Sequence, residues 1–424
     1  METIFAFSTA PGKAGVAVLR ISGPKAHEVT KAYCGDLPTS RELRLRTLKL
    51  SNGQVLDEGL IVVFEAGQSF TGEQSAEWHL HGSIAVQRTA LDALSSEEGL
   101  RPAEAGEFTR RALENERLDL GQIEGLADLI DAETEMQRRR ALMSLGGELA
   151  KKVDTWRADL VKASALLEAT IDFADEDVPD DLSADVLRLI STTQVSIEDE
   201  LIGSVCAERI RTGFEVAIIG PPNAGKSTLL NRLAGREAAI TSSIAGTTRD
   251  VIEVKMDIAG LPVTLLDTAG LRETDDPVER IGVERAQDRA AAADIRIRLS
   301  DTTDLGSEGD IELKSKIDDA AALSEGISGK TGAGVDELIG LLGARLSKRT
   351  QTAGVFDRAR HQIAAKNAIE ALERARLLLE GREVSFEQPA EDLRLANRAL
   401  ESLIGRVDVE NLLDDIFSSF CIGK

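Results

Sequence analysis

The middle of the chain contains the run Phe214-Glu-Val-Ala-Ile-Ile-Gly-Pro-Pro-Asn-Ala-Gly-Lys-Ser227. Residues 214–219 have the apolar pattern of a buried strand, and residues 228–233 have the pattern of a helix. The glycines at 220 and 225 allow the backbone between them to wrap around a phosphate group, and a helix N-terminus attracts an anion. The run therefore predicts a phosphate-binding loop inside an α/β domain.

Two residues of this loop have predicted individual roles. Lys226 is expected to reach the β- and γ-phosphates of a nucleoside triphosphate, and the hydroxyl of Ser227 is expected to bind magnesium. Further along, an apolar strand at 261–266 ends in Asp267-Thr-Ala-Gly270. We expect Asp267 to hold the magnesium through water and the amide of Gly270 to meet the γ-phosphate.

A switch segment is predicted between these motifs. Gly246-Thr-Thr-Arg-Asp250 offers a threonine hydroxyl to the metal, which we assign to Thr248. A loop held by γ-phosphate and magnesium is released on hydrolysis. Hydrolysis also needs a group that positions water, which Leu271 cannot be. Glu279 is the predicted acidic group, and a solvent-exposed carboxylate at a helix start is the alternative.

The base is predicted from a second pair of motifs. Guanine recognition needs a carboxylate facing the ring N–H and amino groups, usually carried by Asn-Lys-x-Asp. Here the run is Ser315-Lys-Ile-Asp318, and Ser328-Gly-Lys330 resembles a Ser-Ala-Lys loop that lies against the base. The preceding run, Ile295-Arg-Ile-Arg-Leu299, has arginines where apolar residues are expected. Because Asp318 is present, GTP is favoured over ATP. The residues predicted to contact GTP are Asn223, Ala224, Gly225, Lys226, Ser227, Thr228, Ser242, Ser243, Ile244, Ala245, Gly246, Thr247, Thr248, Asp267, Thr268, Ala269, Gly270, Lys316, Asp318, Ser328 and Lys330.

Residue composition and the spacing of apolar residues divide the chain into four segments. Residues 1–118 alternate β-rich runs with glycine turns, which predicts an α+β domain. Residues 119–212 and 351–424 repeat apolar residues at helical spacing and flank the α/β segment at 213–350. We expect the α/β domain to be inserted into one helical domain whose halves pack together. Two unrelated helical domains are the alternative.

The composition of the chain limits its possible ligands and its cellular compartment. The net charge of −23 argues against a surface uniformly suited to nucleic acid, although Arg138-Arg-Arg140 is a local basic run, either a solvated helix face or a phosphate contact. The three cysteines lack metal-ligand spacing, and His79 and His81 lack a third ligand. With no signal peptide and no long apolar run, we expect a soluble cytoplasmic protein without membrane segments.

Motifs along the whole chain carry a resemblance to a known family. They are the phosphate loop with Asn223, the run at 246–250, Asp267-Thr-Ala-Gly-Leu-Arg272 and the terminal Phe420-Cys-Ile-Gly-Lys424. Together they resemble the MnmE (TrmE) family of tRNA-modification GTPases. The resemblance implies a tetrahydrofolate-binding α+β domain that forms a homodimer, a helical domain, and an inserted Ras-like P-loop G domain.

The resemblance also implies an activity and partners. The family acts with the FAD-dependent protein MnmG in a heterotetramer. It adds an aminomethyl or carboxymethylaminomethyl group to C5 of the wobble uridine of certain tRNAs. The one-carbon unit comes from 5,10-methylenetetrahydrofolate or 5-formyltetrahydrofolate.

Further site residues rest on the resemblance alone. It implies a potassium ion that replaces an arginine finger, and it assigns to Glu279 the positioning of water through an intermediary. Cys421 is implied in the modification chemistry, with general acid, nucleophile and structural roles left open. The residues implied for potassium are Asn223, Ser242, Ile244 and Thr247, and those implied for folate are Arg20, Glu77, Arg117 and Lys424.

Two other functions fit the same G domain. A GTP-dependent factor that assembles RNA or ribosomal particles needs the same switch but no covalent chemistry, and it should carry a basic RNA-binding module. A scaffold with a vestigial G domain would explain Ser315, whereas the intact Lys226, Ser227 and Asp267 oppose it.

Overall fold

The computed structural model describes residues 2–172, 182–236, 239–240, 253–267, 288–306, 309–381, 386–407, 417 and 423. The chain divides into two compact units, one of Met1–Ile123 with Ile404–Lys424 and one of Glu124–Leu403. The chain turns at Gly405 (φ 79°), and the Leu120 amide donates to the Ile404 carbonyl at 3.2 Å. The assignment of 351–424 to the second half of the helical domain stays a prediction.

The first unit is built on six strands: β1 (Thr3–Phe7), β2 (Ala14–Ser22), β3 (Arg44–Lys49), β4 (Val55–Phe64), β5 (Ser75–Gly82) and β6 (Leu100–Pro102). Their order is β3-β4-β5-β2-β1-β6, and all neighbours are antiparallel except β1 and β6. Because side chains alternate along a strand, the sheet has two distinct faces. Leu19 and Trp78 are buried on one face beneath two helices, and Phe108 packs with Ile4 and Ala6 on the other. The helices are α1 (Ala26–Cys34) and α2 (Ile84–Ser95) on the first face and α3 (Glu107–Glu114), which carries Phe108.

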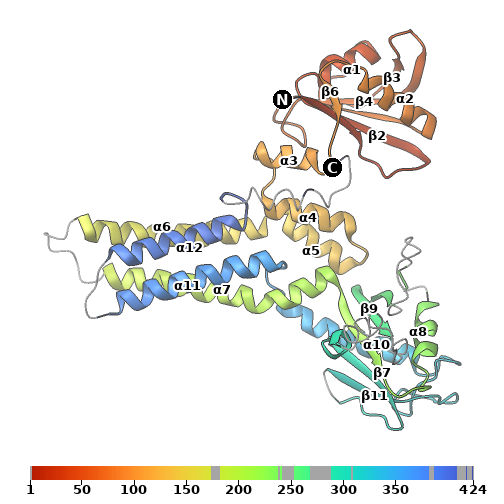
Figure 1. Cartoon of the computed structure of the whole chain (residues 1–424), viewed down its shortest axis with the longest axis vertical. Coiled ribbons are helices and arrows are strands. Elements are labelled where there is room, and N and C mark those ends of the chain that lie inside the picture. Colours follow the sequence, from red (N-terminus) through yellow and green to blue (C-terminus); the bar gives the residue numbers. More distant parts are fainter. Residues whose placement is uncertain are drawn as a thin grey trace, which may run out of the picture. The chain divides into compact units, whose positions relative to one another are not determined.

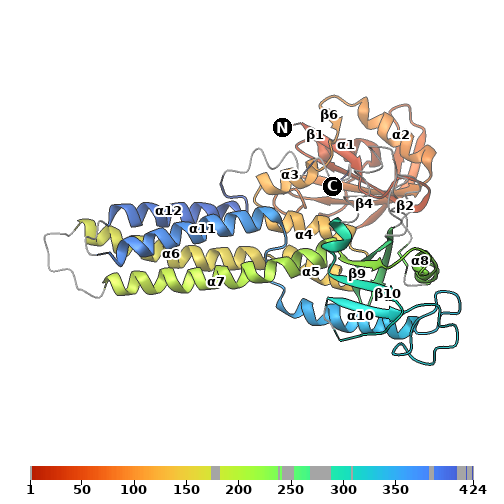
Figure 2. The ribbon, with the colours of Figure 1, turned by 60° about the horizontal axis from the view of Figure 1, so that its bottom comes forward.

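The second unit contains a bundle of long helices that lie side by side in Figures 1 and 2. They are α6 (Glu148–Asp172), α7 (Leu182–Thr212), α11 (Ala359–Leu379) and α12 (Glu387–Ser402), preceded in sequence by α4 (Leu120–Asp131) and α5 (Glu135–Leu145). The inner face of α11 is lined by alanines such as Ala365, Ala368 and Ala375, which are buried and allow close helix contact. Since α6 and α7 precede the α/β segment and α11 and α12 follow it, that segment is inserted into one helical domain, as the sequence predicted.

The inserted domain has a five-stranded sheet in the order β11-β10-β7-β9-β8. Its elements are β7 (Phe214–Ile219), α8 (Lys226–Ala234), β8 (Glu253–Ile258), β9 (Leu261–Asp267), β10 (Ile295–Ser300), β11 (Asp310–Lys314), α10 (Val335–Arg349) and the 3-10 turn η2 (Thr350–Thr352). The strands are parallel except β8, which is antiparallel to β9. The helix α7 runs into β7 through a single residue, Gly213, so the phosphate-loop strand continues directly from the bundle.

The arginines of β10 have a structural explanation. Ile295, Ile297 and Leu299 are buried in the core of the domain, while the alternate residues point to the other face. There Arg296 pairs with Asp310 at 2.6 Å and Arg298 with Glu312 at 3.4 Å, both on the neighbouring strand β11. The run is therefore a strand with one face covered by ion pairs, and the arginines do not interrupt the core.

Candidate nucleotide-binding site

The phosphate loop has a backbone that its sequence explains. Gly220 follows β7 with φ 149°, and a Cβ atom there would lie 2.6 Å from the carbonyl oxygen of Leu299. Asn223 (φ 62°) and Gly225 (φ 96°) also adopt positive φ, which glycine and asparagine tolerate best. The loop thus curls tightly between the sheet and the N-terminus of α8, as predicted.

The two reactive side chains of the loop are held in place. Lys226 is 6% exposed, and its Nζ donates to the carbonyl oxygens of Gly220 at 2.8 Å and Pro221 at 3.0 Å. The Ser227 hydroxyl donates to Oδ2 of Asp267 at 2.8 Å, and Asp267 is buried at the end of β9. A hydroxyl beside a carboxylate supplies the hard oxygen ligands that Mg²⁺ takes together with phosphates, so these residues fit the predicted magnesium.

The predicted base motifs come together beside this loop. The Ser328 hydroxyl donates to Oδ1 of Asp318 at 2.6 Å, and Nζ of Lys330 lies 3.8 Å from Oδ2. Lys316 has φ 64°, which turns the chain between β11 and Asp318. A pocket of about 330 Å³ is lined by Ala224, Gly225, Thr228, Leu229, Leu299, Ser315, Lys316, Asp318, Ile327, Ser328, Gly329 and Lys330. Asn223 lines an adjoining pocket of about 720 Å³.

Several predicted site residues lie outside the described residues. They are Ser242, Ser243, Ile244, Ala245, Gly246, Thr247, Thr248, Thr268, Ala269, Gly270, Glu279, Cys421 and Lys424.

The residues implied for folate lie in the first unit. Arg20 on β2 and Glu77 on β5 are cross-strand partners, and Nε of Arg20 donates to Oε1 of Glu77 at 3.0 Å. The Arg20 guanidinium lies 5.0 Å from the ring centre of Phe70 and 5.7 Å from that of Phe108. Arg117 is exposed at the end of the segment that follows α3. Among the described residues there is no cluster of three or more His, Cys, Asp or Glu side chains that could hold a metal.

A buried ionic network near Arg20 was not predicted. Arg111 is 5% exposed and donates to Glu73 at 3.0 Å and to Glu107 at 3.0 Å. Burial alone would raise the pKa of Glu107, but hydrogen bonds from Arg101, from the Glu104 amide and from Arg111 hold it below its usual value. Glu73 and Arg111 are 38 residues apart, so no local pattern in the sequence pairs them.

A second unpredicted network lies in the helical domain. Glu124 on α4 accepts hydrogen bonds from Arg360 at 2.6 and 2.7 Å, and Nε2 of His361 lies 3.3 Å from its carboxylate. Burial would raise the pKa of Glu124, but the adjacent His361 ring and the hydrogen bonds from Arg360 hold it well below its usual value. These contacts join α4 to α11.

The basic run at 138–140 is not one solvated face. Arg138 and Arg139 pair with Glu135 at 2.8 and 2.7 Å and lower its pKa to about 2. Arg140 is buried, with Nε 3.5 Å from a carboxylate oxygen of Asp357. The run is thus divided between the surface and the interior of the helical domain.

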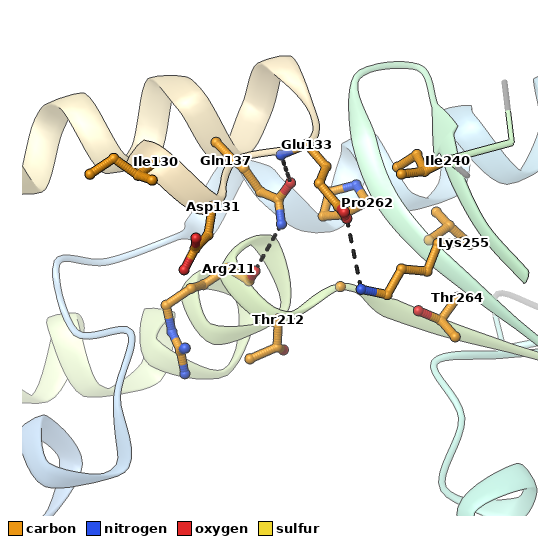
Figure 3. A pocket seen from close by; sticks show the side chains of 13 residues that line it. Ile130, Asp131, Glu133, Gln137, Arg211, Thr212, Ile240, Lys255, Pro262 and Thr264 are labelled. Carbon is orange, nitrogen blue, oxygen red and sulfur yellow. Dashed lines mark hydrogen bonds and ion pairs between the residues drawn. The ribbon is translucent and has the colours of Figure 1, made fainter. Parts of the chain in front are cut away.

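The inserted domain meets the helical domain around a pocket of about 510 Å³, shown in Figure 3. Gln137 on α5 accepts a hydrogen bond from the Glu133 amide at 3.1 Å and donates one to the Arg211 carbonyl at 3.0 Å. Lys255 on β8 lies 3.8 Å from Glu133. The amide of Met136 also donates to the carbonyl of Gly260, in the β8–β9 turn, at 3.0 Å. Strand β8 and the β8–β9 turn thus contact the α4–α5 turn and the first turn of α5.

The fold and the site define a P-loop GTPase domain inserted into a helical domain and preceded by an α+β domain. Comparison with known families gives two matches that together cover almost the whole chain. Residues 120–421 match the family described as "MnmE helical domain", and residues 3–117 match "GTP-binding protein TrmE N-terminus". None of the helices in the described part of the chain combines the length and apolar character needed to span a bilayer.

Full-length relatives have one shared name. The chain is 58% identical to "tRNA modification GTPase MnmE" of Cereibacter sphaeroides and 54% identical to that of Roseobacter denitrificans, with 100% of both chains covered in each comparison. The chain therefore belongs to the MnmE family of tRNA modification GTPases, and the resemblance found in the sequence is confirmed. Among solved structures, Era of Aquifex aeolicus bound to GDP and AlF4⁻ is 28% identical over 31% of this chain and 56% of its own, with a TM-score of 0.24.

Proposed function

We propose that this chain hydrolyses GTP and uses the nucleotide cycle in tRNA modification. The observation that carries the proposal is the set of contacts in the phosphate loop, where Lys226 is buried against the loop carbonyls and Ser227 is bonded to Asp267. An ammonium group and a magnesium ion both offset negative charge on a transferred phosphoryl group. The chain is 54–58% identical in sequence to tRNA modification GTPases over their full length. This similarity supports a role in RNA modification rather than in the assembly of RNA or ribosomal particles.

The proposal includes a potassium ion at the phosphate loop. Asn223 is exposed on the loop and lines the adjoining pocket, so its amide oxygen can reach an ion there. The ion would supply positive charge in place of an arginine finger. Ser242, Ile244 and Thr247 are proposed as its other ligands, and Glu279 as the group that positions water.

The finer chemistry is also part of the proposal. We propose that the first unit binds a folate one-carbon donor at Arg20, Glu77 and Arg117, with Lys424 and Cys421 near it. An FAD-dependent partner would complete addition of the aminomethyl-type group to the wobble uridine. The cross-strand Arg20–Glu77 pair, with aromatic rings beneath the guanidinium, supports a site for a flat polar ligand.

A homodimer through the first unit is the proposed assembly. On the sheet face opposite α1 and α2, Val16, Leu45 and Leu60 are 53%, 56% and 39% exposed, with Leu45 and Leu60 as cross-strand partners. Leu45 and Leu60 lie side by side, and neighbouring exposed apolar residues favour an interface. The variant Leu60→Glu is expected to shift the protein from dimer to monomer in light scattering. A wild-type monomer at working concentrations would contradict the assembly.

The hydrolytic part is tested by replacing sodium with potassium at constant ionic strength. We expect faster GTP hydrolysis in potassium, and we expect Asn223→Ala to remove the difference. Asn231→Ala, an exposed asparagine on α8, is the matched control and should keep it. Equal hydrolysis rates in the two salts would rule out the proposed potassium site. No hydrolysis in either salt would support a vestigial G domain.

The modification chemistry is tested in cells. Nucleoside analysis of tRNA from cells carrying Cys421→Ser is expected to show unmodified or incompletely modified wobble uridine. A normal profile would exclude Cys421 from the chemistry, while Lys226→Ala in the same cells reports whether the GTPase is needed.

A further inference from the structure

Residues 69–73, in the connection between β4 and β5, contact two of the side chains proposed for folate. The carbon atom of the Arg20 guanidinium lies 5.0 Å from the centre of the Phe70 ring. Two residues further on, Gly72 lies against Arg117, since a Cβ atom on Gly72 would be 3.1 Å from Cγ of Arg117. One short loop therefore supports both cations.

The close approach of this loop depends on a glycine. Gly72 has φ 80°, in the left-handed region that favours glycine, and a Cβ atom there would also lie 2.9 Å from Cβ of Asn115. The Asn115 side chain is itself held, because its amide donates to the Thr71 carbonyl at 2.7 Å. Gly67, whose amide donates to the Gly72 carbonyl at 2.7 Å, has φ 79° but would place a Cβ atom in open space.

A buried carboxylate fastens the loop on two sides. Glu73 accepts a hydrogen bond from the Ser22 hydroxyl at 2.6 Å and two from Nη1 of Arg111 at 3.0 and 3.1 Å. The side chains of Glu73 and Arg111 are 12% and 7% exposed, and shielding from water strengthens hydrogen bonds between charged groups. Ser22 follows Arg20 by two residues on β2, and Arg111 lies on α3, which ends shortly before Arg117. Glu73 thus ties the loop to both elements that carry the cations.

The separation of two binding groups decides whether one ligand can contact both. A folate has a pterin with N–H donors and a carbonyl acceptor at one end, and carboxylates at the other. Groups that contact separated parts of a ligand must be held to within about 0.5 Å of the productive geometry. Arginine side chains have many rotamers, so packing against the loop also lowers the entropy lost when a ligand binds.

We propose that the 69–73 loop sets the separation between Arg20 and Arg117. Glu73 is the positioning residue that fastens the loop, and Gly72 is the positioning residue that gives Arg117 its place. The inference rests on the proposed folate site. It predicts that changes in the loop weaken folate binding through the two cations and leave GTP hydrolysis by the inserted domain unchanged.

The test measures the dissociation constant of 5-formyltetrahydrofolate for the full-length protein by isothermal titration calorimetry. Gly72→Ala is expected to raise this constant about fivefold or more, because the added Cβ displaces Arg117. Gly67→Ala is the matched control, since it places alanine at nearly the same φ in the same turn without a contact, and it should stay within about twofold of wild type. An equal loss of affinity in the two variants would overturn the inference.

A double-mutant cycle separates positioning from a general loss of structure. In a chain that carries Arg117→Ala, the further change Gly72→Ala should alter the dissociation constant by less than about twofold, because the displaced side chain is gone. An undiminished effect of Gly72→Ala in that background would show that the glycine acts by another route, and it would overturn the inference.

Glu73→Gln provides a second measurement that leaves the backbone conformation unchanged. It keeps the shape of the side chain but removes the charge paired with Arg111, so the dissociation constant should rise about threefold or more, with kcat for GTP hydrolysis unchanged. Glu114→Gln, an exposed glutamate on α3, is the control and should bind like wild type. Thermal unfolding checks that each variant is folded.

Wild-type affinity in either Gly72→Ala or Glu73→Gln would overturn the inference while the proposed folate site stands. Failure of the wild-type protein to bind 5-formyltetrahydrofolate would overturn both the inference and the proposed folate site.

Discussion

The two ends of the nucleotide site are built in different ways. The phosphate end is built mainly on one continuous stretch, residues 214–227, which Asp267 joins from the end of β9. Its expected phosphate donors are mostly backbone amides and one lysine. The base end combines residues 315–318 with 328–330, and side chains determine what it recognises. A backbone-built site tolerates few sequence changes, because each glycine there satisfies a steric need. In a site built from side chains, one residue can be replaced while the backbone keeps its shape.

Ser315 and Gly220 illustrate this difference. Replacing Gly220 would bring a Cβ within 2.6 Å of the Leu299 carbonyl oxygen, which neither partner can avoid. The serine at 315 replaces the usual asparagine, yet Asp318 and Ser328 keep their hydrogen bond. The comparison predicts large effects at the phosphate end and graded effects at the base end.

The largest effect is expected for Lys226→Ala. It removes the ammonium group that is expected to reach the β- and γ-phosphates, so kcat/KM for GTP should fall about 100-fold or more. Lys314→Ala, an exposed lysine on β11, is the control and should retain the wild-type value. If Lys226→Ala kept a rate within a few fold of wild type, the phosphate end would not be the catalytic end.

A smaller effect is expected for Ser227→Ala, measured as the magnesium concentration needed for half-maximal GTP hydrolysis. Loss of one metal ligand and of the 2.8 Å bond to Asp267 should raise that concentration about tenfold, which corresponds to roughly 1.4 kcal/mol. Excess magnesium should restore part of the rate. Ser324→Ala, an exposed serine of the same domain, should titrate like wild type. An unchanged requirement in Ser227→Ala would exclude this hydroxyl as a ligand.

The sequence predicted the phosphate end in detail, because the strand, the loop and the helix follow one another along the chain. The strands at 214–219 and 261–266 and the bond between Ser227 and Asp267 all agree with it. It also predicted that Asp318 and Ser328 share a pocket. These elements have strong local patterns.

The remaining features depend on contacts between distant residues. The arginines of β10 could not be interpreted without the register that places Arg296 opposite Asp310. The hydrogen bonds that Arg360 donates to Glu124 span 236 residues, and the Leu120 amide donates to the carbonyl of the distant Ile404. None of these pairings leaves a periodic signal in the sequence.

At the base end, Gly329→Ala tests whether the close approach to α8 is needed. The added Cβ must push the loop away from Thr228 and Leu229, so KM for GTP should rise about tenfold while kcat stays near wild type. The matched control is Gly340→Ala on α10, where a Cβ atom would meet nothing within 4 Å. A fall in kcat with KM unchanged would show instead that the two ends of the site are coupled.

The smallest effect is expected for Arg298→Ala on β10. Its side chain is 51% exposed and pairs with Glu312 at 3.4 Å, and exposed ion pairs of this kind contribute about 0–1 kcal/mol. Chemical denaturation should therefore show a loss of less than about 1 kcal/mol, reduced further at high salt, with GDP affinity unchanged. Arg298 lines the phosphate-loop pocket and Ser315 lines both pockets, and both residues depart from the expected pattern, so this variant separates their effects. If Arg298→Ala altered nucleotide selectivity, the β10 arginines would take part in base recognition. The distinction between Ser315, which affects recognition, and Arg298, which affects only stability, would then fail.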